Sequence, residues 1–212
     1  MLRLEGIRKS FGAIRALDGV SLSVPRGAIT IVAGADGAGK STLFKILVGL
    51  VRPDAGAVLL DGEDIGGDAS RVTDLCGYMP ERFSLYTDLS VEENMDFFAA
   101  VQRVPAARRE DLKRRLLERT GMAPFRRRRA GDLSGGMKQK LALSSILLAS
   151  PQLILLDEPT TGVDPLSRIE FFEIIEELKR EGRTLVLSTP YLDEAEKGDE
   201  IVLLRRGRVL LQ

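Results

Sequence analysis

One stretch of the chain, residues 28–47, places an apolar run, a glycine-rich turn and a helical pattern in direct succession. Residues 28–33 form a compact apolar run, which predicts a buried strand. Residues 41–47 carry apolar side chains at helical spacing. Between them lies the turn GADGAGKS at 34–41. A strand that enters a helix through such a turn predicts an α/β core that binds phosphate groups.

The turn matches the pattern G-x-x-x-x-G-K-[ST], in which glycines let backbone N–H groups point at phosphate oxygens beside the positive end of a helix. We expect Lys40 to reach the β- and γ-phosphates and Ser41 to place its hydroxyl on Mg²⁺. The residues expected to bind nucleotide in this loop are Gly34, Asp36, Gly37, Ala38, Gly39, Lys40, Ser41 and Thr42. The loop alone indicates ATP or GTP as the ligand.

An acidic pair, Asp157 and Glu158, follows a second apolar run at 153–156. A carboxylate at the end of a buried strand can reach the Mg²⁺ shell, so Asp157 is a predicted metal ligand. Glu158 is the predicted catalytic base, which polarises the attacking water. Taken alone, such a pair also suits the cap of a helix. Together with the loop, the pair predicts nucleotide hydrolysis, with Lys40 as a second catalytic residue.

The composition excludes several other kinds of site. The chain has no histidine, which removes Ser-His-Asp and Cys-His catalysis and histidine metal sites. Cys76 is the single cysteine, so an internal disulfide and a cysteine zinc site are excluded, and its apolar neighbours predict a buried thiol in a strand. Basic and acidic residues number 31 each, so the net charge gives no reason to expect a nucleic-acid partner.

The hydrophobic pattern also outlines the rest of the chain. It predicts helices at 92–98, 109–119, 136–149 and 165–180, and strands at 21–24, 153–156, 184–187, 201–204 and 209–211. Short apolar runs on either side of a helix are typical of parallel strands in an α/β core. The last two strands predict a hairpin. No apolar run reaches the ~20 residues that a membrane span needs.

Basic residues gather in one part of the chain. Residues 101–130 carry eleven basic and three acidic side chains, and this stretch ends in four successive arginines at 126–129. A solvated face is the simplest interpretation of such a run. The alternative is contact with anionic lipid headgroups, or with a cytoplasmic helix of a transmembrane partner.

Three further motifs occur in a fixed order with the phosphate loop: LSGGM at 133–137, LILLDEP at 153–159 and GVDP at 162–165. With them, the chain resembles the nucleotide-binding domain of ATP-binding-cassette (ABC) ATPases over essentially its full length. The segment LYTDLS at 85–90 resembles the corresponding segment in the cassettes of bacterial exporters.

The resemblance implies an α/β fold: a P-loop NTPase core with an antiparallel β subdomain and an inserted helical subdomain. It implies a single domain over 1–212, with the core at 1–82 and 153–212 and the helical subdomain at about 83–152.

The resemblance also implies a head-to-tail dimer of two cassettes. Ser134, Gly135 and Gly136 of one subunit would close over the ATP that Lys40 of the other subunit holds. Phe11, in the loop after the first strand, would stack on the adenine. The alternative role for Phe11 is that of a partly buried core aromatic.

Two positions depart from the family pattern. Glu81 stands where such domains usually carry glutamine; its carboxylate can ligate Mg²⁺ but adds negative charge near the γ-phosphate. Pro190 occupies the place of the switch histidine and offers neither an imidazole nor an N–H. Loss of one preorganised donor costs ~10²–10³ in rate, so we expect slow or partner-dependent hydrolysis. Alternatively, Thr189, Thr160 or a water takes over the donor role.

The function implied by the resemblance is that of the ATP-hydrolysing subunit or domain of an ABC membrane exporter, with ATP and Mg²⁺ as cofactors. The expected partners are transmembrane permease subunits and a second nucleotide-binding domain, identical or different; no nucleic acid is expected. The expected location is cytoplasmic, peripheral on the inner face of the cell membrane. Two alternatives are a soluble ABC ATPase acting on ribosomes or DNA, and a regulatory ATP-binding cassette with negligible turnover.

Overall fold

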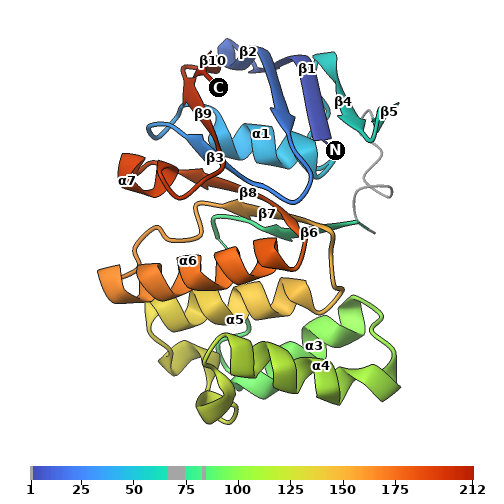
Figure 1. The fold of residues 1–212 in the computed structure, drawn as a ribbon, viewed down its shortest axis with the longest axis vertical. Coiled ribbons are helices and arrows are strands. Elements are labelled where there is room, and N and C mark those ends of the chain that lie inside the picture. Colours follow the sequence, from blue (N-terminus) through green and yellow to red (C-terminus); the bar gives the residue numbers. More distant parts are fainter. Residues whose placement is uncertain (1, 66–74, 83–84) are drawn as a thin grey trace. The chain divides into compact units, whose positions relative to one another are not determined.

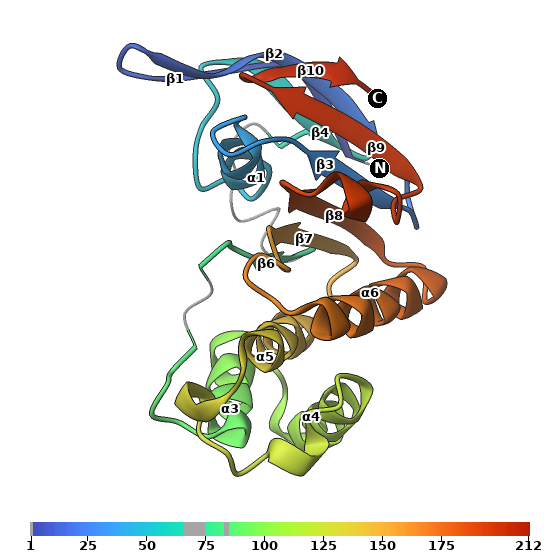
Figure 2. The ribbon, with the colours of Figure 1, turned by 90° about the vertical axis from the view of Figure 1, so that its left-hand side faces the viewer.

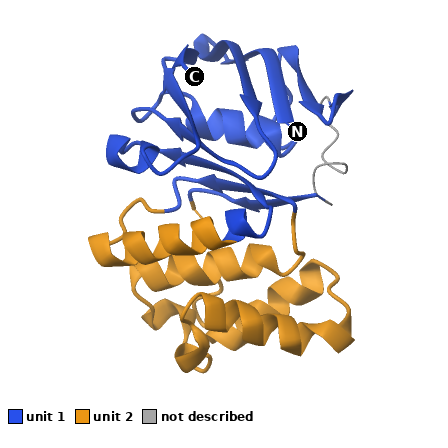
Figure 3. Cartoon of the chain, viewed as in Figure 1, with its two compact units in different colours: residues 1–81, 152–159, 178–212 blue, residues 82–151, 160–177 orange. Residues whose placement is uncertain are grey.

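The computed structural model describes residues 2–65, 75–82 and 85–212. The chain forms two compact units (Figure 3). The first contains residues 1–81, 152–159 and 178–212, and the second contains residues 82–151 and 160–177. Both units are therefore assembled from segments that lie far apart in the sequence.

The first unit contains a six-stranded, mainly parallel sheet with the strand order β10-β9-β3-β8-β7-β6 (Figure 1). Its strands are β3 (Ile29–Ala33), β6 (Cys76–Met79), β7 (Leu153–Asp157), β8 (Thr184–Thr189), β9 (Glu200–Arg205) and β10 (Arg208–Leu211). β3, β7 and β8 are buried along their whole length, which is why their sequences read as continuous apolar runs. β9 and β10 pair in the antiparallel sense, which confirms the predicted hairpin.

Cys76 lies in a strand as predicted, but the residue is only partly buried. The difference has a topological cause, because β6 is the last strand of the sheet and pairs with β7 on one side. Burial still raises the pKa of the thiol to about 12. The thiol therefore stays protonated near neutral pH and is a poor nucleophile.

A second sheet in the first unit has four antiparallel strands in the order β2-β1-β4-β5. Its strands are β1 (Leu2–Phe11), β2 (Ile14–Val24), β4 (Ala55–Leu60) and β5 (Glu63–Asp64). The sequence pattern revealed only the end of β2, at 21–24. Irregular register along β1 and β2 breaks the alternation of buried and exposed positions, so the period-two signal is lost there.

The helix α1 (Lys40–Leu47) follows the phosphate loop and contacts β2 of one sheet and β7 of the other (Figure 2). Its residues Leu43 and Phe44 are fully buried. Burial of one such side chain stabilises a fold by about 1.5–3 kcal/mol. The helix that opens at the phosphate loop is therefore held by the core of the first unit.

The second unit is helical. Its elements are α3 (Val91–Val101), α4 (Ala106–Arg119), η1 (Ala123–Phe125), η2 (Ala130–Asp132), α5 (Gly135–Leu147) and most of α6 (Pro165–Arg180). α3 begins with a capping box, in which the Ser90 hydroxyl accepts the Glu93 N–H and the Glu93 carboxylate accepts the Ser90 N–H. The short helix α7 (Leu192–Ala195) belongs to the first unit. Within the described residues, no helix has both the length and the apolar character that a membrane span requires.

The boundary of the helical unit differs from the expected one. The predicted core included residues 160–177, but these residues belong to the second unit. Lys140 of α5 forms an ion pair with Glu170 of α6. A Cβ on Gly136 of α5 would lie 2.4 Å from the Ser167 side chain of α6, so the two helices approach closely. Contacts of this kind, which periodicity does not reveal, assign most of α6 to the helical unit.

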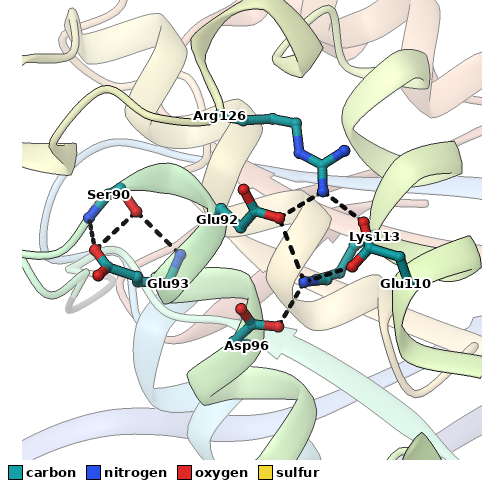
Figure 4. Close-up of polar contacts among 7 residues, drawn as sticks. All are labelled: Ser90, Glu92, Glu93, Asp96, Glu110, Lys113 and Arg126. Carbon is teal, nitrogen blue, oxygen red and sulfur yellow. Dashed lines mark hydrogen bonds and ion pairs between the residues drawn. The ribbon is translucent and has the colours of Figure 1, made fainter.

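A cluster of ion pairs joins α3, α4 and the segment that follows α4 (Figure 4). The buried Lys113 Nζ lies 2.6 Å from Asp96 Oδ1, 2.9 Å from Glu110 Oε2 and 3.6 Å from Glu92 Oε1. Arg126 lies 2.5 Å from Glu92 Oε1 and 2.6 Å from Glu110 Oε1. Hydrogen bonds from Arg126 and Lys113 lower the pKa of Glu110 to about 2. Glu110 therefore stays charged at neutral pH, and the cluster cross-links three segments of the unit.

The four arginines at 126–129 do not share one environment. Arg126 belongs to the ion-pair cluster, whereas Arg127, Arg128 and Arg129 are exposed. The Arg128 guanidinium lies 4.7 Å from the centroid of the Phe125 ring, a cation–π contact. The solvated-face interpretation thus applies to three of the four arginines, and contact with headgroups or a partner helix stays a hypothesis.

Candidate nucleotide site

The phosphate loop connects β3 to α1, and two glycines fix its course. Gly39 has a φ of 108°, and a Cβ there would lie 2.6 Å from the Ala16 carbonyl oxygen. A Cβ on Gly34 would lie 2.3 Å from the Leu204 carbonyl oxygen. Gly39 caps α1 without a side chain. The N–H groups of the first helical turn are therefore suited to an acceptor from outside the helix, such as a phosphate oxygen.

The Lys40 side chain is held inside this loop and is only 3% exposed. Its Nζ donates to the carbonyl oxygens of Gly34 and Ala35 at 2.6 and 3.1 Å. The same nitrogen forms an ion pair with Glu158 Oε1 at 3.0 Å. The fold thus brings the two predicted catalytic residues, Lys40 and Glu158, into contact.

Asp157 ends β7 and its carboxylate is buried. The pKa of Asp157 is raised, chiefly by burial, and the carboxylates of Glu158 and Glu81 add to this effect. Hydrogen bonds from the Ser188 and Ser41 hydroxyls oppose it. The other two predicted metal ligands, Ser41 and Glu81, are therefore both close enough to Asp157 to affect its pKa. A cation bound there would relieve the repulsion among the carboxylates.

The donors beside the loop fit Mg²⁺. The Ser41 hydroxyl hydrogen-bonds to the Asp157 carboxylate, and both are hard oxygen donors of the kind that Mg²⁺ prefers. Over 2–65, 75–82 and 85–212, no three Asp, Glu, His or Cys side chains form a group that could hold a metal ion. The Ser41 and Asp157 oxygens fit a Mg²⁺ ion that takes its further ligands from phosphate and water.

Two residues near the end of β6 add to this environment. Glu81 is exposed, and the hydroxyl of Tyr78 is buried with no hydrogen-bond partner among the described residues. Burial raises the pKa of Tyr78, and the nearby Asp157 carboxylate adds to the effect. A buried hydroxyl beside carboxylates is a place for an ordered water. The role of Glu81 as a metal ligand stays a prediction.

Glu158 has an unusual backbone, with a φ of 51°. For a residue with a side chain, this left-handed conformation costs about 1–2 kcal/mol. Its N–H donates to Ser188 Oγ at 2.9 Å, and Ser188 Oγ donates to Asp157 Oδ1 at 2.6 Å. Ser188 was not among the predicted site residues. Its only signal was a polar residue that directly follows the apolar run at 184–187.

Pro190 directly follows β8, and the hydroxyl of the preceding residue, Thr189, already forms hydrogen bonds. Thr189 is buried, and its hydroxyl donates to Glu194 Oε2 at 2.5 Å while accepting the Tyr191 N–H at 3.1 Å. A threonine hydroxyl has a single proton to donate. In this conformation, Thr189 therefore cannot supply the donor that a switch histidine would provide.

The LSGGM motif at 133–137 contains the start of α5. Ser134 caps the helix, and its Oγ accepts the N–H of Met137 at 3.3 Å. Ser134 and Gly135 are exposed, so a second molecule can reach them. Gly136 is buried, and its expected contact with nucleotide stays a prediction. The cause of the burial is its close approach to α6, since a Cβ at Gly136 would clash with Ser167.

Gly136→Ala is expected to lower the free energy of unfolding by about 1–3 kcal/mol, the usual effect of overpacking a close contact. Gly135→Ala is the matched control, because a Cβ there meets only the Gly162 carbonyl oxygen, at 3.4 Å, and alanine favours a helix. Urea unfolding followed by circular dichroism measures both variants. Equal stability of the two variants would contradict the packing role of Gly136.

Phe11 was predicted to lie in a loop, and this prediction is wrong. The residue is the last of β1 and pairs with Ile14 of β2. Pairing with Ile14 across the hairpin extends the strand to Phe11. The side chain is 50% exposed, and Lys9 Nζ lies 5.5 Å from the ring centroid. A half-exposed ring does not fit the core alternative, and stacking on adenine stays a prediction.

Known proteins resemble the chain along its whole length. A family model described as "ABC transporter" matches residues 17–161. The Escherichia coli (strain K12) protein YbhF, a probable multidrug ABC transporter ATP-binding protein, is 41% identical over 214 residues, which cover 100% of this chain and 37% of YbhF. The daunorubicin resistance ATP-binding protein DrrA3 of Streptomyces coeruleorubidus is 36% identical over 212 residues, which cover 100% of this chain and 67% of DrrA3.

Solved structures share the fold. MJ1267, an ATP-binding cassette of an ABC transporter, matches with a TM-score of 0.91 and 28% identity, covering 100% of this chain and 90% of that one. The dimeric structure of MJ0796, a bacterial ABC transporter cassette, matches with a TM-score of 0.89 and 26% identity, covering 100% of this chain and 97% of that one. These matches and the two sheets confirm the predicted fold class.

Proposed function

Because the chain belongs to the ABC transporter family, we propose that it is the ATP-binding and ATP-hydrolysing cassette of an ABC membrane exporter. ABC transporter ATP-binding domains are ATPases. The observation that carries the proposal is the contact between Lys40 and Glu158 beside the hydrogen-bonded pair Ser41 and Asp157. One site then contains a phosphate-binding lysine, a general base and oxygen donors for a metal ion.

In the proposed reaction, the loop N–H groups and Lys40 hold the β- and γ-phosphates. To bind them, Lys40 Nζ exchanges its contacts with backbone carbonyls and with Glu158 for phosphate oxygens. This exchange releases the Glu158 carboxylate, which then accepts a proton from the attacking water. The base thus becomes available when nucleotide is in place. Ser41 and Asp157 would hold a Mg²⁺ ion bound with the nucleotide, and this ion would neutralise charge on the phosphate oxygens.

We propose that the cassette works in a head-to-tail dimer. Ser134 and Gly135 are exposed at the N-terminal end of α5, where backbone N–H groups favour a phosphate. In the dimer, this turn covers the ATP held by the partner cassette. The dimeric state of MJ0796 supports this arrangement.

We also propose that the chain's own site hydrolyses ATP slowly. Pro190 provides no donor for the γ-phosphate, and the Thr189 hydroxyl is engaged with Glu194. Glu81 adds a carboxylate close enough to raise the pKa of Asp157. The chain would then lend its exposed Ser134 turn to the partner's ATP while its own site turns over poorly.

The partners and location follow from the same premise. The chain spans 37% of YbhF, so the activity of a whole exporter depends on further parts. We propose that transmembrane permease segments or subunits and a second cassette, identical or different, supply them. The cassette then lies on the cytoplasmic face of the membrane and moves these segments when the dimer closes on ATP.

Purification from native membranes in detergent tests the proposed function. We expect an integral membrane protein to copurify and the complex to hydrolyse ATP when Mg²⁺ is present. Lys40→Ala is expected to abolish ATP binding by this cassette without preventing copurification. Recovery with ribosomes or DNA and no membrane protein would instead favour a soluble ABC ATPase. ATP binding without single-turnover hydrolysis would favour a regulatory cassette.

A further inference from the structure

We propose that Ser188 is a positioning residue of the ATPase site, whose hydroxyl orients the Asp157 carboxylate and the Glu158 backbone together. The inference rests on the proposed function of those two acidic residues and adds a third residue that acts through them. Ser188 is fully buried in β8 and faces the end of β7, where its Cα partner in the sheet is Asp157.

The geometry lets one hydroxyl serve both residues. Ser188 Oγ donates its proton to Asp157 Oδ1 at 2.6 Å and accepts the Glu158 N–H at 2.9 Å. A serine hydroxyl has one proton to donate and two lone pairs, so the two bonds do not compete. The bond to the carboxylate is charge-assisted and short, which restricts rotation of the Asp157 side chain. Rotation of the Ser188 side chain would break both bonds at once.

The Glu158 backbone needs this acceptor because of where the strand ends. Pairing of β7 with β8 stops at Asp157 and Ser188. The next residue, Glu158, turns away with a φ of 51°, so its N–H leaves the ladder. A buried N–H without an acceptor is unfavourable, and Ser188 Oγ supplies one. The left-handed conformation at Glu158 directs its side chain to Lys40, whose Nζ lies 3.0 Å away.

Other buried hydroxyls in the same sheet do not have this arrangement. Within the part of the chain that the structure describes, Thr30 Oγ1 in β3 has no hydrogen-bond partner, and the Thr189 hydroxyl bonds to Glu194. The contact of Ser188 with both acidic residues is therefore not a general property of hydroxyls buried in this sheet. Thr30, fully buried in a neighbouring strand, provides a matched control.

Loss of a group that orients a metal ligand typically lowers metal affinity or activity about 10–100-fold. We therefore expect Ser188→Ala to raise the Mg²⁺ concentration needed for half-maximal ATP hydrolysis by about 10–100-fold. Its affinity for ATP in EDTA should equal that of the wild type, because the phosphate loop and Lys40 are untouched. A residue that only stabilised the fold would not produce this difference between ATP with and without Mg²⁺.

The experiment compares five forms of the 212-residue chain: wild type, Ser188→Ala, Ser188→Cys, Thr30→Val and Asp157→Asn. Cysteine keeps nearly the volume of serine but is a weak donor, so it tests the hydrogen bonds if the alanine variant does not fold. Calorimetry measures binding of ATP with Mg²⁺ and with EDTA, and single-turnover assays measure hydrolysis against Mg²⁺ concentration. Circular dichroism checks folding. Thr30→Val is expected to match the wild type in its Mg²⁺ requirement.

The outcomes separate this inference from the proposed function. A folded Ser188→Ala or Ser188→Cys variant with the wild-type Mg²⁺ requirement would overturn the role of Ser188. So would an equal loss of ATP affinity in Mg²⁺ and in EDTA. Asp157→Asn serves as the reference: if it leaves the Mg²⁺ requirement unchanged, the assignment of the metal site itself is wrong.

Discussion

Glu158→Gln is expected to lower the single-turnover rate of ATP hydrolysis by about 10²–10⁴-fold, because a positioned general base contributes that much. Glutamine keeps the size of the side chain but cannot accept a proton from water. ATP binding should persist, since the ion pair of Lys40 with the carboxylate, at 3.0 Å, is one of the contacts that phosphate replaces. Rapid-quench assays measure hydrolysis, and calorimetry measures ATP affinity.

The control for this substitution is Glu196→Gln, which removes an exposed carboxylate outside the site. It is expected to hydrolyse ATP at the wild-type rate. If Glu158→Gln also hydrolysed ATP at that rate, Glu158 would not be the base, or the measured turnover would come from a partner's site. Repeating the assay on the chain alone and on the membrane complex distinguishes these two explanations.

Pro190→His is expected to raise the rate of hydrolysis by about 10²–10³-fold, the typical contribution of one preorganised donor to a transition state. The imidazole N–H would supply the γ-phosphate donor that proline lacks. The structure strengthens this expectation, because Thr189 already donates its only proton to Glu194. Steady-state ATPase assays of the isolated chain measure the change.

Pro190→Ala tests separately the two groups that proline lacks, a backbone N–H and a side-chain donor. Alanine restores a backbone N–H but provides no side-chain donor. If Pro190→Ala accelerates hydrolysis as much as Pro190→His, the missing N–H is the cause of slow turnover. Fast hydrolysis by the wild-type chain, unchanged in Pro190→His, would contradict the proposed asymmetry between the two sites of the dimer.

The local parts of the site were predictable because their chemistry lies in consecutive residues. The phosphate loop needs glycines and a lysine in one turn between a strand and a helix, and the structure has β3 and α1 on either side of it. The Asp157–Glu158 pair was found for a similar reason, since it directly follows a buried strand. The roles of these residues in ATP chemistry stay proposals that the experiments above test.

Other features depended on segments that meet only in the folded chain. Gly136 sits in a conspicuous motif, yet its burial follows from the approach of α6. Phe11 was expected in a loop, but its pairing with Ile14 extends β1 to that residue. Arg126 is the first of four successive arginines in the sequence, whereas its ion pairs with two carboxylates distinguish it from its neighbours. Each of these outcomes depends on a partner distant in sequence.

By itself, the sequence determined the phosphate loop, the acidic pair at a strand end, most of the helices and the order of motifs, because short-range periodicity and turn chemistry encode them. Only the tertiary structure decided that Lys40 and Glu158 form an ion pair and that Ser188 joins Asp157 to the Glu158 backbone. The physical reason is that parallel strands align residues from distant segments at one edge of a sheet, and hydrogen bonds there depend on distances that no linear pattern contains.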